Sequence, residues 1–180
     1  FHPKHRWGNF WSAGGAWVIN RENFMASTYN WLDILKLKAS VGSQGNDNIG
    51  NFRYTNVYSI ENANGNVSTV FSSKGAENIT WETNTNINFG LEFGFLQDLV
   101  SGGFEGFIRN TTDMLLAFPV APSMVYSSYY ANVGDMQNAG IELELNVAPV
   151  RTDNVLWNLN LNLTHLRNRI TMLPEERKTK

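Results

Sequence analysis

The stretch Thr80–Phe95 reads TWETNTNINFGLEFGF and decides the fold. From Ile87 onward, large apolar side chains occupy every second position, and Asn, Gly and Glu fill the positions between them. A helix would mix polar and apolar residues on one face, because its side chains repeat about every 3.6 residues. A period of two instead predicts one β-strand, about three times the usual strand length of roughly 5–6 residues.

Alternation of the same kind recurs along the chain. Leu35-Lys36-Leu37-Lys38 and Ile141-Glu142-Leu143-Glu144 show it clearly, and Asn alternates with Leu after Trp157. We therefore expect an all-β protein with six antiparallel strands. The expected strands cover residues 8–19, 34–44, 80–95, 101–115, 138–148 and 156–168.

The connections between these strands alternate in length. Residues 44–79 and 116–137 are long and polar, whereas residues 96–100 and 149–155 are barely long enough to reverse a strand. The first connection could hold a helical turn at residues 20–25. Successive connections of an antiparallel sheet lie at opposite ends, so the long ones share one end. Transmembrane barrels have this arrangement, with long extracellular loops and short periplasmic turns.

Composition limits the functional classes. Fourteen Lys and Arg against sixteen Asp and Glu give a net charge of −2, and only 17% of residues are charged. This balance argues against nucleic-acid binding through a basic surface. The absence of cysteine excludes a disulfide scaffold, a Cys-ligated zinc site and a cysteine nucleophile. The most apolar run, residues 114–120, is too short for a membrane helix and contains a proline.

Two architectures explain the pattern. A membrane barrel explains the strand lengths, since about 9–11 tilted residues cross the bilayer. It also explains why aromatic residues lie near the expected strand ends, where girdles form: Trp17, Trp81, Phe93, Phe95 and Trp157. A soluble β-sandwich alternates in the same way, although its strands rarely exceed about 10 residues. We favour the barrel and keep the sandwich as the alternative.

Several motifs, taken in order, match a known family. They include Arg6-Trp7-Gly8-Asn9-Phe10, Trp31-Leu32-Asp33-Ile34-Leu35-Lys36-Leu37-Lys38-Ala39-Ser40, Ile79-Thr80-Trp81-Glu82 and Asn138-Ala139-Gly140-Ile141-Glu142. These stretches resemble the RWG-F, WL–LKLRAS, LKWE and N-GIE signatures of SusC/RagA-type TonB-dependent outer-membrane transporters. The resemblance extends over essentially all 180 residues.

This resemblance implies a fold and a function. Residues 1–180 would be a slice from the C-terminal part of a 22-stranded barrel in the outer membrane of a Gram-negative bacterium, with residues 44–79 and 116–137 as extracellular loops. Such transporters import glycans, oligosaccharides or peptides together with a SusD-like lipoprotein lid, driven through TonB. The plug domain and the TonB box are absent from this sequence. A passive porin-like barrel and a soluble carbohydrate-binding β-sandwich stay open as alternatives.

Polar residues on the inward-facing parity are candidates for lining the lumen. Their carboxylates resemble the paired acids of a glycosidase, but a wet lumen lined by charge is the simpler interpretation. The expected lumen-facing residues are Lys36, Lys38, Glu82, Asn84, Asn88, Glu92, Glu105, Arg109, Glu142, Glu144 and Asn160. We expect no enzyme and no catalytic, cofactor-binding or metal-binding residue. The three histidines are too scattered for a zinc site, and Asn46-Asp47-Asn48 lacks the spacing of an EF-hand.

Tyrosines in the two long connections are candidates for ligand or lid contacts: Tyr54, Tyr58, Tyr126, Tyr129 and Tyr130. Their flat rings, surrounded by Asn amides, suit stacking and hydrogen bonding with sugars or peptide backbone. Packing of the loops against one another or against the lid is an equally good explanation.

Overall fold

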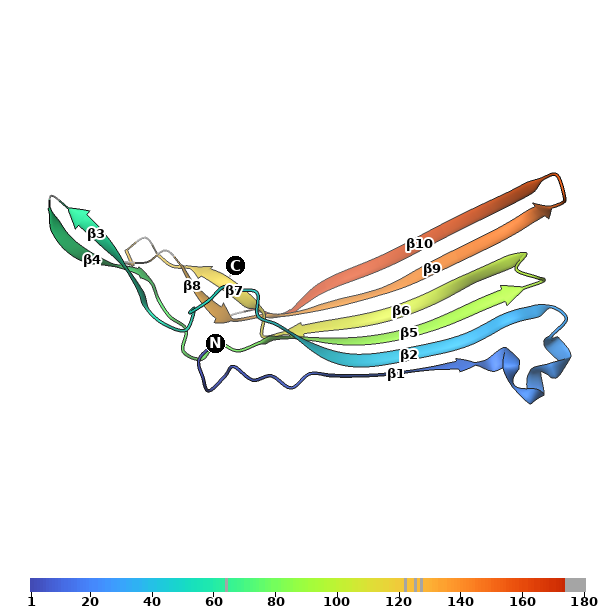
Figure 1. Cartoon of the computed structure of the whole chain (residues 1–180), viewed down its shortest axis with the longest axis horizontal. Coiled ribbons are helices and arrows are strands. Elements are labelled where there is room, and N and C mark those ends of the chain that lie inside the picture. Colours follow the sequence, from blue (N-terminus) through green and yellow to red (C-terminus); the bar gives the residue numbers. More distant parts are fainter. Residues whose placement is uncertain (64, 122, 125, 127, 174–180) are drawn as a thin grey trace.

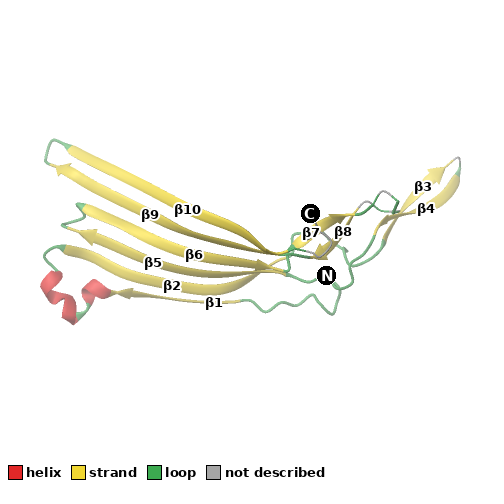
Figure 2. Ribbon diagram, turned by 180° about the vertical axis from the view of Figure 1, so that it is seen from behind, coloured by secondary structure: helices red, strands yellow, loops and turns green. Residues whose placement is uncertain are grey.

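The computed structural model describes residues 1–173 except residues 64, 122, 125 and 127. Its main feature is one curved, antiparallel sheet of six long strands in the order β1-β2-β5-β6-β9-β10, which Figures 1 and 2 show from opposite sides. The six expected strands are therefore confirmed. Their bounds are β1 (Trp11–Val18), β2 (Leu32–Asn46), β5 (Glu82–Phe95), β6 (Val100–Thr112), β9 (Asp135–Arg151) and β10 (Leu156–Met172).

The two long connections, which the sequence predicts to be loops, contain hairpins. One consists of β3 (Val57–Ala63) and β4 (Asn66–Ser73), and the other of β7 (Leu115–Pro119) and β8 (Ser128–Asn132). Both extend beyond the same end of the six-stranded sheet (Figure 1). We call this the long-loop end. The connection after β1 forms two 3₁₀ turns, η1 (Ile19–Arg21) and η2 (Asn23–Thr28), in place of the single expected turn.

Two strand ends differ from the expected bounds for physical reasons. The strand expected at 101–115 stops at Thr112, because Asp113 has a positive φ of 55° and turns the chain into β7. The strand expected at 138–148 continues through Pro149 to Arg151. Beyond Ala148, whose N–H still donates to the Leu99 carbonyl, this strand pairs only with β10, beside a register shift between Trp157 and Leu159. A proline is tolerated where a ladder has an edge or a bulge.

The six-stranded sheet separates polar from apolar side chains. We call the side with Lys38, Asn88 and Glu105 the polar face, and the side with Leu37, Phe89 and Ile141 the apolar face. No second sheet packs on the apolar face within the described residues. Its large side chains stay exposed, including Ile87, Phe89, Ile141, Leu161 and Leu163. A sandwich would cover them, so the sandwich alternative was wrong. The six strands do not close into a barrel by themselves, since β1 and β10 are free edges.

None of the helices in the described part of the chain is long and apolar enough to cross a membrane.

Candidate functional site

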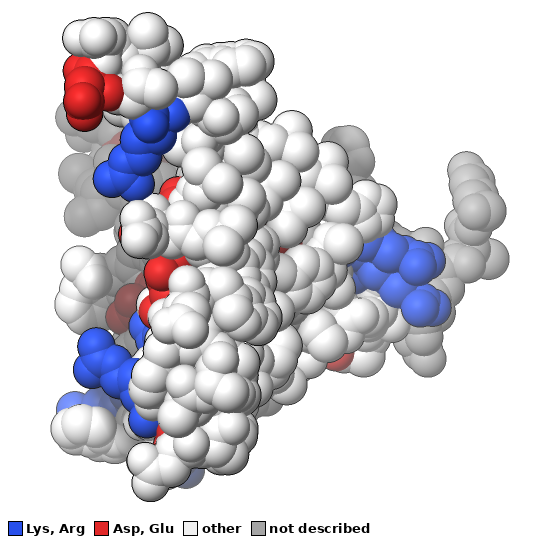
Figure 3. Space-filling view, turned by 90° about the vertical axis from the view of Figure 1, so that its right-hand side faces the viewer, with Lys and Arg blue, Asp and Glu red and all other residues white. Residues whose placement is uncertain are grey.

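The strand register places all eleven predicted lumen residues on the polar face. One row of paired residues runs Lys38, Gly90, Glu105, Glu142 across β2, β5, β6 and β9. The neighbouring row contains Lys36, Glu92 and Glu144, and Asn160 of β10 has the same parity. We call the end opposite the long-loop end, where the turns 96–99 and 152–155 lie, the short-turn end. Seen from this end, the charged residues gather mainly along one side of the sheet (Figure 3).

Four of these residues form an ion-pair cluster near the short-turn end. Glu92 accepts from Lys36 at 3.2 Å and from Lys38 at 3.1 Å, and Lys38 also pairs with Glu105. Lys38 reaches Glu105 across an intervening strand because Gly90 lies between them. A Cβ at Gly90 would collide with the Lys38 side chain. The cluster contains partly exposed groups, so each pair contributes at most about 1 kcal/mol.

Amides, hydroxyls and one guanidinium group, that of Arg109, occupy the middle of the polar face. The Asn88 amide donates to Ser40 Oγ at 3.1 Å, and Arg109 Nε donates to Asn86 Oδ1 at 2.7 Å. Closer to the long-loop end, the Thr111 hydroxyl donates to Asn84 Oδ1 at 2.6 Å. Apart from the Arg109 guanidinium, the groups named here are uncharged donors and acceptors, unlike those of the ion-pair cluster. This part of the face can form hydrogen bonds with a neutral polar solute.

Two polar side chains attach the long-loop end to the sheet. Glu82 accepts from the Asn46 amide at 3.1 Å and from the backbone N–H of Leu115 at 3.2 Å. Asn132 donates to the carbonyls of Thr80 and Asp113, both at 2.9 Å, and accepts from the Thr80 N–H at 2.8 Å. Glu82 was expected to face the lumen; it lies on the polar face, and its carboxylate accepts hydrogen bonds that join the rim to the sheet.

The tyrosine candidates divide into two groups at the long-loop end. Tyr58 and Tyr126 both pack edge-on against Phe71, with ring centroids 5.3 and 5.5 Å apart. Lys74 lies over Tyr129 at 5.9 Å and Arg53 over Tyr130 at 4.7 Å, joining the two long connections. Cation–π pairs of this kind hold the loops together.

The remaining tyrosine, Tyr54, contacts the N-terminal segment of the chain. It packs edge-on against His2 at 5.7 Å and lines two hollows, one with Asp47 and Phe52 and the other with Thr55 and Glu77. The structure thus shows loop packing for four of the five tyrosines. Within the described residues, no group of three or more His, Asp or Glu side chains could hold a metal ion.

Some important residues were not among the predicted sites. Gly90 leaves space for the Lys38 side chain, and the Asn132 side chain forms hydrogen bonds with three backbone groups. Both roles depend on how the strands pair, which a single sequence does not show. Arg53 and Lys74 were missed because their aromatic partners are distant in the chain.

The apolar face ends at different levels on its two edge strands. On the four strands between them, the last apolar side chains toward the long-loop end lie in one row of paired residues: Val41, Ile87, Ile108 and Ala139. On β1 the apolar run continues two residues further, to Trp11. On β10 it stops at Leu163, four residues short of that row, and basic side chains follow.

Comparison with known proteins identifies the family. The TonB dependent receptor-like β-barrel family model matches residues 2–178. The chain is 34% identical over 182 aligned positions to the TonB-dependent receptor SusC of Bacteroides thetaiotaomicron, covering 96% of this chain and 18% of SusC. It is 30% identical over 174 positions to the TonB-dependent receptor P26 of Formosa agariphila, covering 94% and 18%.

Solved structures agree with this assignment. The structure of the RagAB peptide transporter superposes with a TM-score of 0.88 at 30% identity, covering 96% of this chain and 19% of that one. The RagAB peptide importer in the open-open state gives 0.78 at 31% identity, covering 91% and 18%. The chain thus spans about a fifth of the length of its relatives. It belongs to the β-barrel family of TonB-dependent outer-membrane receptors, a family of transporters and receptors of the SusC and RagA kind.

Proposed function

We propose that this chain is part of the barrel wall of a TonB-dependent transporter that imports oligosaccharides or peptides through the outer membrane. The observation that carries the proposal is an exposed apolar face opposite a hydrogen-bonding polar face on one sheet of long strands. In this proposal the apolar face contacts lipid, and the polar face lines the lumen of a closed barrel of about 22 strands. The eleven polar-face residues then contact water, plug or passing substrate.

The amide-rich middle of the polar face supports a neutral polar substrate. Ser40, Asn86 and Asn88 offer donors and acceptors that match both sugar hydroxyls and peptide backbone. The RagAB peptide transporter, a relative at 30% identity, supports peptide as one such substrate. A passive porin-like barrel is the second candidate, since a wet polar lumen suits it equally well.

Transport by the full-length protein tests the proposal. Cells that express it are given fluorescent oligosaccharides or peptides, with and without an intact TonB system. Uptake that requires both the protein and TonB is the expected result. Uptake that continues without TonB would support the porin-like barrel, and absence of the protein from the outer-membrane fraction would exclude both.

The β3–β4 hairpin is the part of the long-loop end best suited to contact a SusD-like lid. Its pairing places Tyr58, Ile60 and Val67 on one face, where they are 59, 77 and 74% exposed. The opposite face carries Glu61 and Ser68. Exposed apolar patches rimmed by polar residues are typical of protein–protein contacts. Together with tyrosines at the loop end, this hairpin would form the outer rim of the substrate entrance.

The lid contact has a matched test in the full-length protein. Ile60→Asp and Val67→Asp should reduce the amount of lipoprotein that co-purifies, whereas Ser68→Asp on the opposite face should leave it unchanged. Equal co-purification with all three variants would move the lid contact away from this hairpin.

Membrane orientation follows from the same proposal. An epitope tag inserted after Gly65 should be labelled on intact cells, because long loops of outer-membrane barrels are extracellular. A tag at Asp153, in the turn between β9 and β10, should be reached only after the outer membrane is opened. The reverse pattern would contradict the orientation and the import proposal with it.

A further inference from the structure

A hollow on the apolar face is the starting point. It lies over β6 and β9, has a volume of about 500 Å³, and its apolar walls include Ile87, Phe89, Ile108 and Ile141. The absence of a side chain at Gly106 leaves room in the hollow, because a Cβ at this position would have no other atom within 4 Å. The volume is in the range of ligand sites, and the hollow is open on the side that would face lipid. It is therefore shaped to take an apolar chain lying along the barrel surface.

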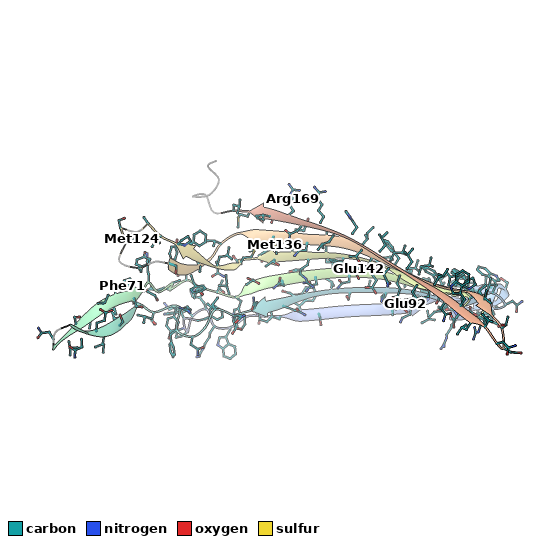
Figure 4. All side chains as sticks on the ribbon, turned by 90° about the horizontal axis from the view of Figure 1, so that it is seen from above. Phe71, Glu92, Met124, Met136, Glu142 and Arg169 are labelled. Atoms are coloured by element: carbon teal, nitrogen blue, oxygen red, sulfur yellow. The ribbon has the colours of Figure 1, made fainter. Side chains whose placement is uncertain are left out.

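Basic side chains adjoin this hollow on one side only. His165 and Arg167 of β10 line it, and Arg169 follows on the same face two residues further toward the long-loop end. Figure 4 shows Arg169 on β10, projecting away from the rest of the sheet. All three residues are exposed. Among the residues the structure describes, neither arginine side chain forms an ion pair or a hydrogen bond with a partner.

The position of these arginines along β10 determines their depth in the bilayer. A lipid-facing Arg is costly at the centre of a bilayer and nearly neutral at its interface. The apolar run on β10 ends at Leu163, and the row of paired residues containing Arg169 also holds the polar Thr85, Asn110 and Gln137. Arg167 lies two residues nearer the middle of the strand, in the row of Ala139, Ile108 and Ile87. Arg169 therefore lies at the level of the lipid headgroups, and the long Arg167 side chain can extend its guanidinium toward the same level.

We propose that this face binds one phosphorylated, acylated lipid of the lipid A type from the outer leaflet. One acyl chain lies in the hollow over Gly106, and a phosphate group contacts Arg167 and Arg169. We choose a phosphorylated lipid because its charge is complementary to that of the arginines: two guanidinium groups can each bind phosphate through paired N–H donors. His165 supplies a further donor between phosphate and hollow. The inference rests on the proposed outer-membrane location, which puts the long-loop end at the outer leaflet.

The test uses the full-length protein purified from outer membranes in mild detergent. Binding of fluorescent lipid A is measured for the wild type, for Arg167→Gln/Arg169→Gln and for Gly106→Leu, which fills the hollow. Loss of charged hydrogen bonds to the phosphate should weaken binding by about tenfold or more. Gly106→Leu should weaken it as well, without changing the charge.

Matched controls separate this site from general effects. Gly15 has the same parity on β1, and a Cβ there also meets nothing within 4 Å, so Gly15→Leu adds the same bulk far from the arginines. Arg151→Gln removes a charge at the opposite end of the sheet. Both should bind like the wild type. Dephosphorylated lipid A should bind the wild type as weakly as the double variant binds lipid A, and inorganic phosphate at millimolar concentration should not displace lipid A.

Several outcomes would overturn the inference. They are unchanged binding by the double variant, equal loss in the controls, full displacement by inorganic phosphate alone, or a change of oligomeric state in the double variant with lipid binding intact. The last result would mean that a second protein copy covers the face.

Each variant is first shown to be a folded barrel by its faster migration in unheated gels. A wild type that is absent from the outer membrane would refute the proposed function itself, whereas a correctly located protein without arginine-dependent binding refutes only this inference.

Discussion

The six-stranded sheet and the long-loop end are stabilised in different ways. The sheet is a continuous ladder of backbone hydrogen bonds in which one face presents large apolar side chains to the surroundings. The long-loop end has short hairpins that depend on individual side chains: Glu82, Asn132 and the cation–π pairs of Arg53 and Lys74. The sheet therefore depends on lipid and neighbouring strands to cover its apolar face and edges, whereas the hairpins depend on side-chain contacts with the sheet.

The largest expected effect comes from removing that environment. The isolated 180-residue chain has two free sheet edges and an exposed apolar face, and both promote association. In buffer without detergent we expect aggregates or oligomers in gel filtration. A sharp monomer peak with cooperative unfolding would contradict the dependence of the sheet on lipid and neighbouring strands.

The next largest effect is expected when a charge is placed on the apolar face of β10, compared with the same charge on its polar face. Leu161 and Asn160 are adjacent on β10, on the apolar and polar faces respectively. In the full barrel, Leu161→Arg should cost about 2–4 kcal/mol in the free energy of unfolding, because it places a charge in the hydrocarbon region. Asn160→Arg should cost much less, since it faces water. Urea unfolding in lipid vesicles measures both, and equal costs would contradict the assignment of faces.

The separation of faces could be read from the sequence because it depends only on parity. Ile87 and Asn88 fall on opposite sides whatever strands lie next to β5. The side-chain contacts between strands could not be predicted from the sequence, because they depend on the register in which the strands pair. Parity put Lys38 and Glu105 on one face, but only the register shows that Gly90 lies between them.

The hairpins of the long connections were missed for a different reason. Their strands have only 5–8 residues and lie in segments rich in Asn, Gly and Ser, where a single-sequence pattern favours loops. A signal for β3–β4 was present, since Asn64-Gly65 is a common hairpin turn and Tyr58 and Ile60 alternate before it. Residue 64 itself lies outside the described residues.

A moderate effect is expected where the loop end joins the sheet. Asn132→Ala removes three hydrogen bonds with the backbone of Thr80 and Asp113. At about 0.5–1.5 kcal/mol for each bond, local opening of the β7–β8 hairpin should become easier by about 1.5–4.5 kcal/mol. Hydrogen exchange of the full-length protein should show faster exchange in residues 113–134 and unchanged exchange in β5 and β6. Faster exchange throughout the sheet would mean that the two regions unfold together.

The smallest expected effect lies within the sheet, at the ion-pair cluster. Gly90→Val should displace the Lys38 side chain and break its pair with Glu105. Because these groups are partly exposed, the loss should stay below about 1 kcal/mol of unfolding free energy in the full barrel. Valine favours strands, so in a Lys38→Ala background the same substitution should be neutral or stabilising. Urea unfolding of the wild type, both single variants and the double variant completes this cycle. If Gly90→Val costs as much without the Lys38 side chain as with it, the glycine serves backbone packing, and the polar face of the sheet is held by its ladder alone.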